Sequence, residues 1–176
     1  MADPATYVID PEHTVVALMV DHLGFAKTLL QFTDVSGSFV YDDETQTLSE
    51  LSARVGAESI ESFSAARDGH VRGKDFLDAA TFPEITFTAD GGTPSSDNTG
   101  TVEGTLTLLG QSLPLVLDVT LNKIAPYPFL HQKETIGVSA RGTVTRSDFG
   151  MTYAVDGGIV GDEVEVLIEV EALRED

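Results

Sequence analysis

The stretch ARDGHVRGKDFLDAATFPEITF, residues 66–87, places one histidine among three basic and four acidic side chains. Groups of this kind can transfer protons, bind a charged head group, or cap and pair within a surface turn. Asp75 or Asp78 could cap a helix start, and Arg67 and Asp68 are expected to pair within the fold. The capped turn is favoured, and Arg67 stays a candidate for contact with an anionic head group because guanidinium suits phosphate.

Four histidines are the other candidates for chemistry, and they form neither an HExxH nor an HxH pattern. If residues 13–22 are extended, His13 and His22 face opposite ways. The spacing therefore predicts no metal site. The alternative to a binding protein without catalysis is an enzyme, a hydrolase or another type. It would act on a lipid-like substrate and use His13, His22 or His70 with nearby carboxylates.

Composition excludes several functions. The 176 residues carry a formal net charge of −19 and no cysteine, so disulfides, thiol catalysis and thiolate metal sites are excluded. Such a charge repels phosphate backbones and anionic lipid head groups, so we expect no nucleic-acid partner. No apolar run approaches the ~20 residues of a membrane-spanning helix, so the protein is not expected to be integral to a membrane.

The strongest structural signal is an alternation of apolar and polar residues, which is typical of half-buried antiparallel strands. It is clear in TVEGTLTLLG, LPLVLDVTL and EVEVLIEVEA, and weaker over 14–22, 34–41, 46–57, 84–89 and 134–146. Turn-rich pieces separate these runs, which gives about eight strands joined mostly by hairpins. Only 22–31 and 65–80 are interpreted as short helices or irregular segments.

A sheet with so few helices must cover itself, which predicts an all-β, eight-stranded antiparallel barrel with one or two short helices. Strand parity points one set of side chains inward, where a long apolar ligand could bind. His22 continues the parity of its strand, Phe76 and Phe82 extend an aromatic cluster, and Arg67 and Arg146 are the basic residues that could reach the barrel mouth. The inward set is Val16, Leu18, Val20, Phe39, Phe87, Leu106, Leu108, Val138 and Val144.

Seven segments, taken in order, resemble the YceI-like, polyisoprenoid-binding family over residues 7–172. They are YVIDPEHTVVALMVDHLG, VSGSF, ESIES, ARDGHVRGKDFLDAATFPEITF, LTLLGQSLPLVLDV, TVTRSDFG and VGDEVEVLIEVEA. The resemblance implies an extended lipocalin-like barrel that carries or stores one long amphiphile without catalysis. No cofactor is then required, and the implied ligands are ubiquinone or another quinone, polyprenyl phosphates or pyrophosphates, and fatty amides.

The resemblance also sets expectations for organisation and location. Residues 7–173 are expected to form one domain, preceded by a segment, residues 1–6, that is disordered or introduced by cloning. Family members are periplasmic or secreted, whereas the start MADPATYVID lacks the features of a signal peptide, which leaves a cytoplasmic location as the alternative. The expected partner is the lipid ligand, and a homodimer stays open.

Overall fold

The computed structural model describes residues 4–129 and 131–175. Within them strand β1 already begins at Ala5, whereas residues 1–3 of the segment expected to be disordered lie outside the described part of the chain. The strands are β1 Ala5–Ile9, β2 Val15–His22, β3 Ala26–Phe32, β4 Val35–Asp42, β5 Thr47–Gly56, β6 Ile60–Glu61, β7 Glu84–Ala89, β8 Thr93–Pro94, β9 Thr99–Leu108, β10 Gln111–Pro126, β11 Glu134–Thr145 and β12 Val160–Arg174. The helices are α1 Ala65–Arg72 and the short 3-10 turns η1 Pro11–His13, η2 Ala57–Ser59, η3 Arg146–Phe149 and η4 Asp156–Gly158.

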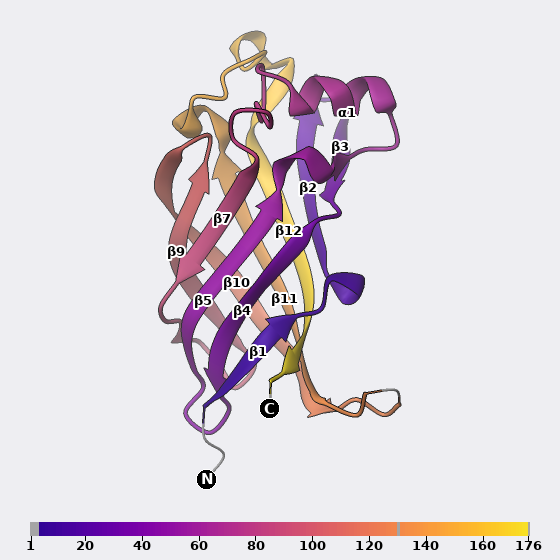
Figure 1. Ribbon diagram of the computed structural model, residues 1–176. Helices are drawn as coiled ribbons and strands as arrows, with labels where there is room; N and C mark the ends of the chain where they lie inside the picture. The colour runs from indigo at the N-terminus through magenta and orange to yellow at the C-terminus, as the bar shows by residue number, and fades with distance from the viewer. Residues whose placement is uncertain (1–3, 130, 176) are drawn as a thin grey trace.

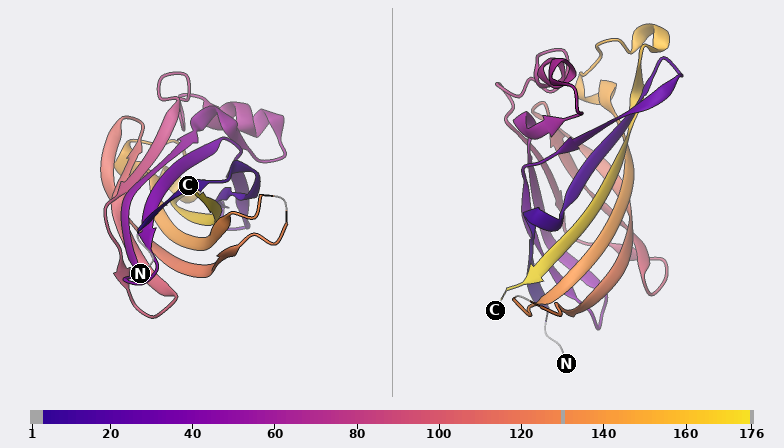
Figure 2. Two further views of the ribbon diagram at one scale, coloured as in Figure 1. Left: turned by 60° about the horizontal axis from the view of Figure 1, so that its bottom comes forward. Right: turned by 90° about the vertical axis from the view of Figure 1, so that its right-hand side faces the viewer.

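Eight of these strands close into an antiparallel barrel, which confirms the predicted fold (Figure 1). Their order is β1-β4-β5-β7-β9-β10-β11-β12, and β1 pairs with β12 to complete the ring. The strands tilt and wind around a common axis (Figure 2). Closure removes the edges of this eight-stranded ring, which would otherwise present unpaired backbone groups.

Strand β12 pairs with β11 along one edge, and along its other edge it pairs with both β1 and β2. The pairing with β2 adds a branch to the ring. The last residues of β12 pair with β1, as in Ile9↔Ala172, whereas Val164 and its neighbours pair with β2. Strand β3 continues the branch through pairs such as Leu18↔Leu30. The helical or irregular interpretation of 22–31 is therefore wrong from Ala26 onward, where the chain is a strand.

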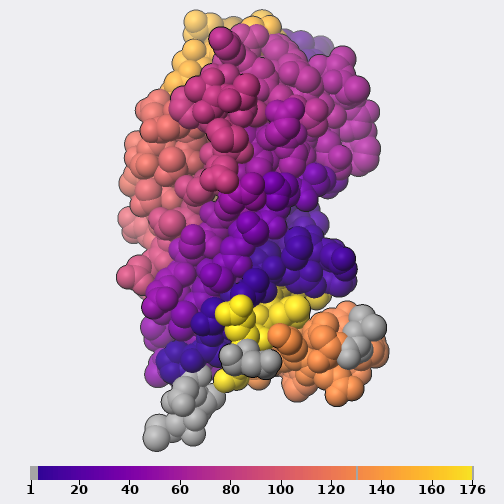
Figure 3. All heavy atoms as spheres, in the orientation of Figure 1, coloured from indigo at the N-terminus to yellow at the C-terminus, as the bar shows by residue number. Residues whose placement is uncertain are grey.

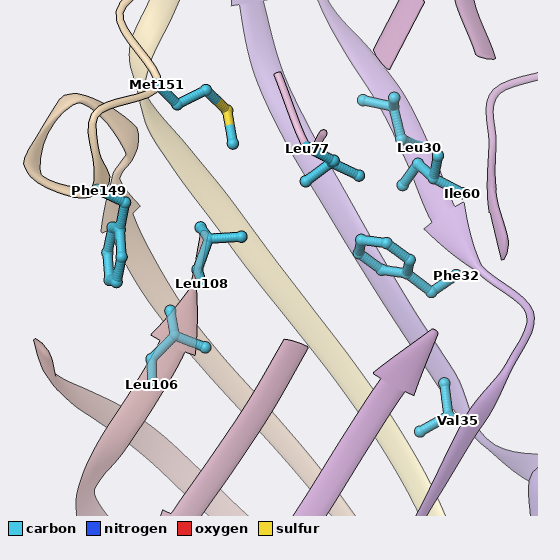
Figure 4. Close-up of a cluster of buried hydrophobic side chains, with 9 residues drawn as sticks. All are labelled: Leu30, Phe32, Val35, Ile60, Leu77, Leu106, Leu108, Phe149 and Met151. Atoms are coloured by element: carbon cyan, nitrogen blue, oxygen red, sulfur yellow. The ribbon is translucent and has the colours of Figure 1, made fainter. Parts of the chain in front are cut away.

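Two clusters of buried apolar side chains lie inside the barrel. The larger one lies toward the end that carries α1 (Figure 4) and consists of Leu30, Phe32, Val35, Ile60, Leu77, Leu106, Leu108, Phe149 and Met151. The smaller one contains Tyr7 and Phe39, whose rings stack at 5.7 Å, together with Ile136 and two alanines. The Tyr7 hydroxyl donates to Glu134 at 2.8 Å, so its polar tip is satisfied inside an apolar environment.

We call the end of the barrel that carries α1 the apical end. Leu23 donates its backbone N–H to Ile159, and the ring of Tyr153 packs edge-on against Phe76 at 5.3 Å, so the loops there meet one another. Phe82 packs against the β9–β10 turn. Figure 2 shows α1, the β2–β3 turn and the loop before β12 together at this end. The apical end comprises residues 22–26, 62–82, 108–112 and 149–160.

Helix α1 is eight residues long, and no helix in the described ranges is long and apolar enough to span a lipid bilayer. Ser64 caps its start by accepting a hydrogen bond from the N–H of Arg67. The expected cap by Asp75 or Asp78 is wrong, because both residues follow the helix. Segment 62–82 covers the upper part of the barrel in the space-filling view (Figure 3).

Candidate functional site

The barrel encloses a cavity of about 540 Å³, within the size range of small-molecule sites. Apolar side chains from β4, β5, β7, β9, β10, β11 and β12 form most of its wall, and others come from β1, β2, β3, β6, α1 and the loops after α1 and η3. The alternation in the sequence is the cause, since one face of each strand is apolar. On β12 the wall residues include Val164, Val166, Ile168 and Val170, while Glu165 and Glu169 between them are exposed.

The structure brings nearly all of the sequence-predicted site residues onto this one wall. Contact of these residues with a ligand stays a prediction. The residues on the wall are Val16, Leu18, Val20, His22, Phe39, Arg67, Phe76, Phe87, Leu106, Leu108, Val138, Val144 and Arg146.

Phe82 is the exception, and it does not line the cavity. It follows a turn in which its N–H donates to Asp78, and its ring lies beside Gly110. A Cβ on Gly110 would lie 2.9 Å from the Phe82 ring. Because the residue is in a turn, strand parity cannot orient it. Its ring instead packs against the β9–β10 turn and so joins the 62–82 segment to that turn.

Several wall residues were not predicted. Leu30 and Phe32 come from β3, the strand that the sequence interpretation missed, and their spacing with Thr28 was the available signal. Met151 and Tyr153 come from the loop after η3, where no periodic pattern exists. These residues place more of the cavity wall at the apical end than the sequence indicated.

Arg146 is the main buried charge of the cavity wall, with only 2% of its surface exposed. Its Nε donates to the carbonyl of Gly161 at 2.8 Å, Nη1 to Met151 at 2.8 Å and Nη2 to Val160 at 2.9 Å. Burial lowers the pKa of Arg146, and the Asp162 carboxylate opposes this shift. Three backbone carbonyls therefore hold a positive charge at the apical end.

Arg67 and Asp68 do not form the expected direct pair. Both reach the buried Ser62: Arg67 Nε donates to Ser62 Oγ at 2.7 Å, and this hydroxyl lies 2.5 Å from Asp68 Oδ1. Arg67 Nη2 also donates to the Ser62 carbonyl at 2.8 Å. Much of the donor capacity of Arg67 is therefore committed to the fold, although its side chain still borders the cavity.

The histidines do not converge. His22 and His70 border the cavity, and His70 Nε2 lies 2.8 Å from Asp75. His13 lies on η1, away from the cavity wall, with Nδ1 2.8 Å from Asp10. Asp10, His13 and Glu171 offer three possible metal ligands within 4.8 Å of one another, but the ion pair already accounts for two of them. Sequence spacing could not reveal Glu171 as a neighbour.

The ends of the cavity differ from its middle. At the apical end exposed polar residues, among them His22, Arg67 and Tyr153, border it. At the other end the border includes the turn between β8 and β9, where Gln46 donates to the carbonyl of Asp97. The arrangement is an apolar interior with polar groups at its limits, which suits a ligand with a long apolar body.

Comparison with known proteins agrees with this architecture. The model of the YceI-like domain matches residues 7–172. A UPF0312 protein of Yersinia pestis is 31% identical over 97% of this chain and 87% of its own length. The crystal structure of a Campylobacter jejuni YceI protein has a TM-score of 0.79 and 29% identity, covering 89% of this chain and 90% of that one.

Two more distant structures share the fold. Burkholderia cenocepacia BcnA has a TM-score of 0.82 at 22% identity and covers 93% of this chain and 98% of its own. A domain from Saccharophagus degradans described as polyisoprenoid-binding has a TM-score of 0.67 at 13% identity, covering 97% and 99%. With a family model that matches almost the whole chain, the protein belongs to the YceI-like family.

Proposed function

We propose that the protein binds one long-chain isoprenoid or similar amphiphile inside the barrel, to carry or store it, without catalysis. The observation that carries this proposal is the cavity of about 540 Å³ with an apolar interior and polar groups at its ends. The description of the Saccharophagus degradans domain as polyisoprenoid-binding supports the same ligand class.

The apolar wall is sufficient for tight binding. Each CH₂ group removed from water contributes about 0.8 kcal/mol, so a tail of ten or more carbons supplies most of the affinity. Little ordering of the protein is needed, because closed strand pairing already fixes the wall. Selectivity then follows from the length and width of the ligand more than from its head group.

The charges favour a neutral head group, such as a quinone or fatty amide, at least as much as a polyprenyl phosphate. The net charge of −19 opposes an anionic ligand at long range. Arg146 already donates to three carbonyls, and Arg67 donates to Ser62. Their remaining N–H groups suit one or two hydrogen bonds to a carbonyl oxygen.

Catalysis by the histidines finds less support. His13 lies away from the cavity, and the acid beside His70 is half exposed at the surface. An active site requires several titratable groups around one point of the cavity. The mainly apolar wall suits retention of a ligand.

The test is mass spectrometry of an organic extract of the purified protein. We expect one class of long-chain amphiphile near one molecule per protein. Leu18→Glu, which places a charge on the wall, should remove it. Val15→Glu on the same strand is the control, because Val15 is 44% exposed. An extract with no such compound, or equal retention by both folded variants, would contradict the proposal.

A further inference from the structure

The apical end displays a set of apolar side chains to solvent. Among the described residues ten large apolar side chains are exposed, and half of them belong to this end. Phe25 is 88% exposed at the β2–β3 turn, and Leu23 and Ile159, joined by a backbone hydrogen bond, are each 47% exposed. Tyr153 is 46% exposed, and Phe63, before α1, is 90% exposed. Such a concentration marks an interaction surface.

The backbone conformation of two of these exposed residues is also unfavourable. Leu23 has φ 54° and Gly24 has φ 71°, and Phe25 closes the turn by donating to His22. This geometry is that of a two-residue turn with both central φ values positive, which favours Asn-Gly and disfavours leucine. Phe63 has φ 62°. Neither the backbone strain nor the exposed apolar side chains stabilise the folded state. Residues that combine the two are typical of functional surfaces.

Charge is distributed very unevenly between the apical end and the rest of the molecule. Residues 22–26 and 108–112 contain no Asp, Glu, Lys or Arg, residues 62–82 contain three acids and three bases, and residues 149–160 contain only Asp156. The residues of the apical end thus have a formal net charge of −1, with Asp21, Arg146 and Asp162 at its border, and most of the total of −19 lies elsewhere. At physiological salt charges are screened over about 8 Å, so most of the acidic body has little effect at this end.

The exposed apolar surface also continues into the cavity. Tyr153 is half exposed and borders the cavity, with its ring packed against Phe76 and His70. Phe76 in turn lies under the guanidinium of Arg146. A ligand that leaves the cavity past Tyr153 therefore emerges beside the exposed apolar residues.

We propose that the apical end docks on the surface of a lipid bilayer with zwitterionic or neutral head groups, with Leu23, Phe25 and Ile159 entering the head-group region. The inference rests on the proposed function, because a protein that binds a membrane-resident amphiphile must contact the membrane to take it up or release it. Exposed apolar side chains at an end with few charges can enter the interface, with Asp21 at the base of the β2–β3 turn, whereas the acidic body stays in solution. Binding should therefore resist salt and should weaken on anionic vesicles.

Single tryptophans provide the test, because the chain contains none. Phe25→Trp places a reporter in the apical turn. Phe129→Trp is the matched control, since Phe129 is 63% exposed on the β10–β11 loop at the opposite end. With phosphatidylcholine vesicles the emission of the apical tryptophan should shift to shorter wavelength, at low and high salt, and that of the control should not. An unresponsive apical tryptophan, or equal shifts in both proteins, overturns the proposal.

A second measurement uses vesicle flotation of unlabelled protein. Phe25→Ser combined with Ile159→Ser should lower the fraction bound to phosphatidylcholine vesicles about tenfold. Phe129→Ser should leave it unchanged. If the double variant floats like the unmodified protein, or if the apical residues instead mediate self-association in solution, the bilayer is not the partner.

The two proposals fail separately. A protein that retains a long-chain amphiphile in its organic extract but ignores vesicles contradicts docking alone. A ligand-free protein that floats with vesicles through Phe25 and Ile159, yet never extracts an amphiphile from them, contradicts the binding function and leaves docking in place.

Discussion

The guanidinium carbon of Arg146 lies 5.7 Å from the centroid of the Phe76 ring. This contact joins the loop before β12 to the segment that follows α1. The same guanidinium donates to the carbonyls of Met151, Val160 and Gly161. A single buried side chain therefore ties the apical loops to one another at the edge of the cavity.

Replacing Arg146 should destabilise the protein strongly. Arg146→Ala leaves three carbonyls without their donor and removes the contact with Phe76, so we expect a loss of about 3–5 kcal/mol in the free energy of unfolding. Arg141→Ala is the control, because Arg141 and its partner Glu169 are half exposed and should contribute at most about 1 kcal/mol. Urea denaturation of both variants measures the difference. Similar losses would show that Arg146 has no special structural role.

Gly104 provides the space that the Phe87 ring occupies in the cavity wall. A Cβ at Gly104 would lie 2.4 Å from the ring and 2.6 Å from the Thr88 carbonyl oxygen. Gly104→Ala should therefore cost about 1–3 kcal/mol of stability. Gly69→Ala, inside α1 where the added carbon meets no atom from outside its own helix within 4 Å, should instead stabilise by about 0.5–1 kcal/mol. Thermal unfolding that ranks the variants the other way would refute this account.

Ligand retention should depend on the cavity wall more than on the basic residue at its edge. Phe87→Asp introduces a charge into the apolar interior and should abolish retention. Arg67→Ala removes hydrogen bonds to Ser62 and one cation, so retention should fall far less. The ratio of extracted ligand to protein, measured on variants whose circular dichroism is unchanged, distinguishes them. Loss in the arginine variant alone would show that head-group recognition dominates.

The ion pair of His13 and Asp10 should be visible in its pH dependence. The hydrogen bond that protonated His13 donates to Asp10 raises the pKa of His13 above its usual 6.5, so the pair stabilises the fold below pH 6.5 and its contribution fades as pH rises through the raised pKa. Burial, the largest single effect on Asp10, raises its pKa, but the hydrogen bonds from His13 and from the Glu12 N–H together with the nearby histidine charges lower it by more, so the contribution also fades in acid. NMR titration should show the His13 pKa falling in Asp10→Asn. An unchanged His13 pKa in this variant would show that His13 and Asp10 do not form an ion pair.

Leu23→Asn should separate stability from docking. Asparagine tolerates the positive φ of this position better than leucine does, so the variant should be more stable by about 0.5 kcal/mol. It should also bind phosphatidylcholine vesicles more weakly, because one apolar anchor is lost. Denaturation and flotation are measured on the same preparation. A variant that is both less stable and equally bound would argue against strain and against docking.

The alternation of residue types was enough to predict most of the barrel. In β12 Val164, Val166, Ile168 and Val170 line the cavity, and in β10 Leu115, Leu117, Val119 and Leu121 do the same. These strands are long and strictly periodic, so their parity could be assigned without knowing their partners. The covering argument then required closure, because helices are scarce.

The sequence could not reveal features that depend on turns or on distant partners. Strand β3 was missed because Leu29 interrupts the alternation of Thr28, Leu30 and Phe32 with polar residues and because its turn contains Leu23-Gly24 in place of the usual Asn-Gly. Phe82 was misplaced because a residue in a turn has no strand parity. The three carbonyls around Arg146 come from loops whose positions only the tertiary fold defines.

Closure of the barrel through Tyr7↔Arg174 has a consequence for biosynthesis. The first and last strands of the ring are far apart along the chain, so the barrel cannot close until β12 has left the ribosome. Until then the apolar faces of the earlier strands stay open to solvent. Long-range pairing of this kind slows folding and prolongs exposure to aggregation. The nascent chain should therefore depend on chaperones until its last strand is available.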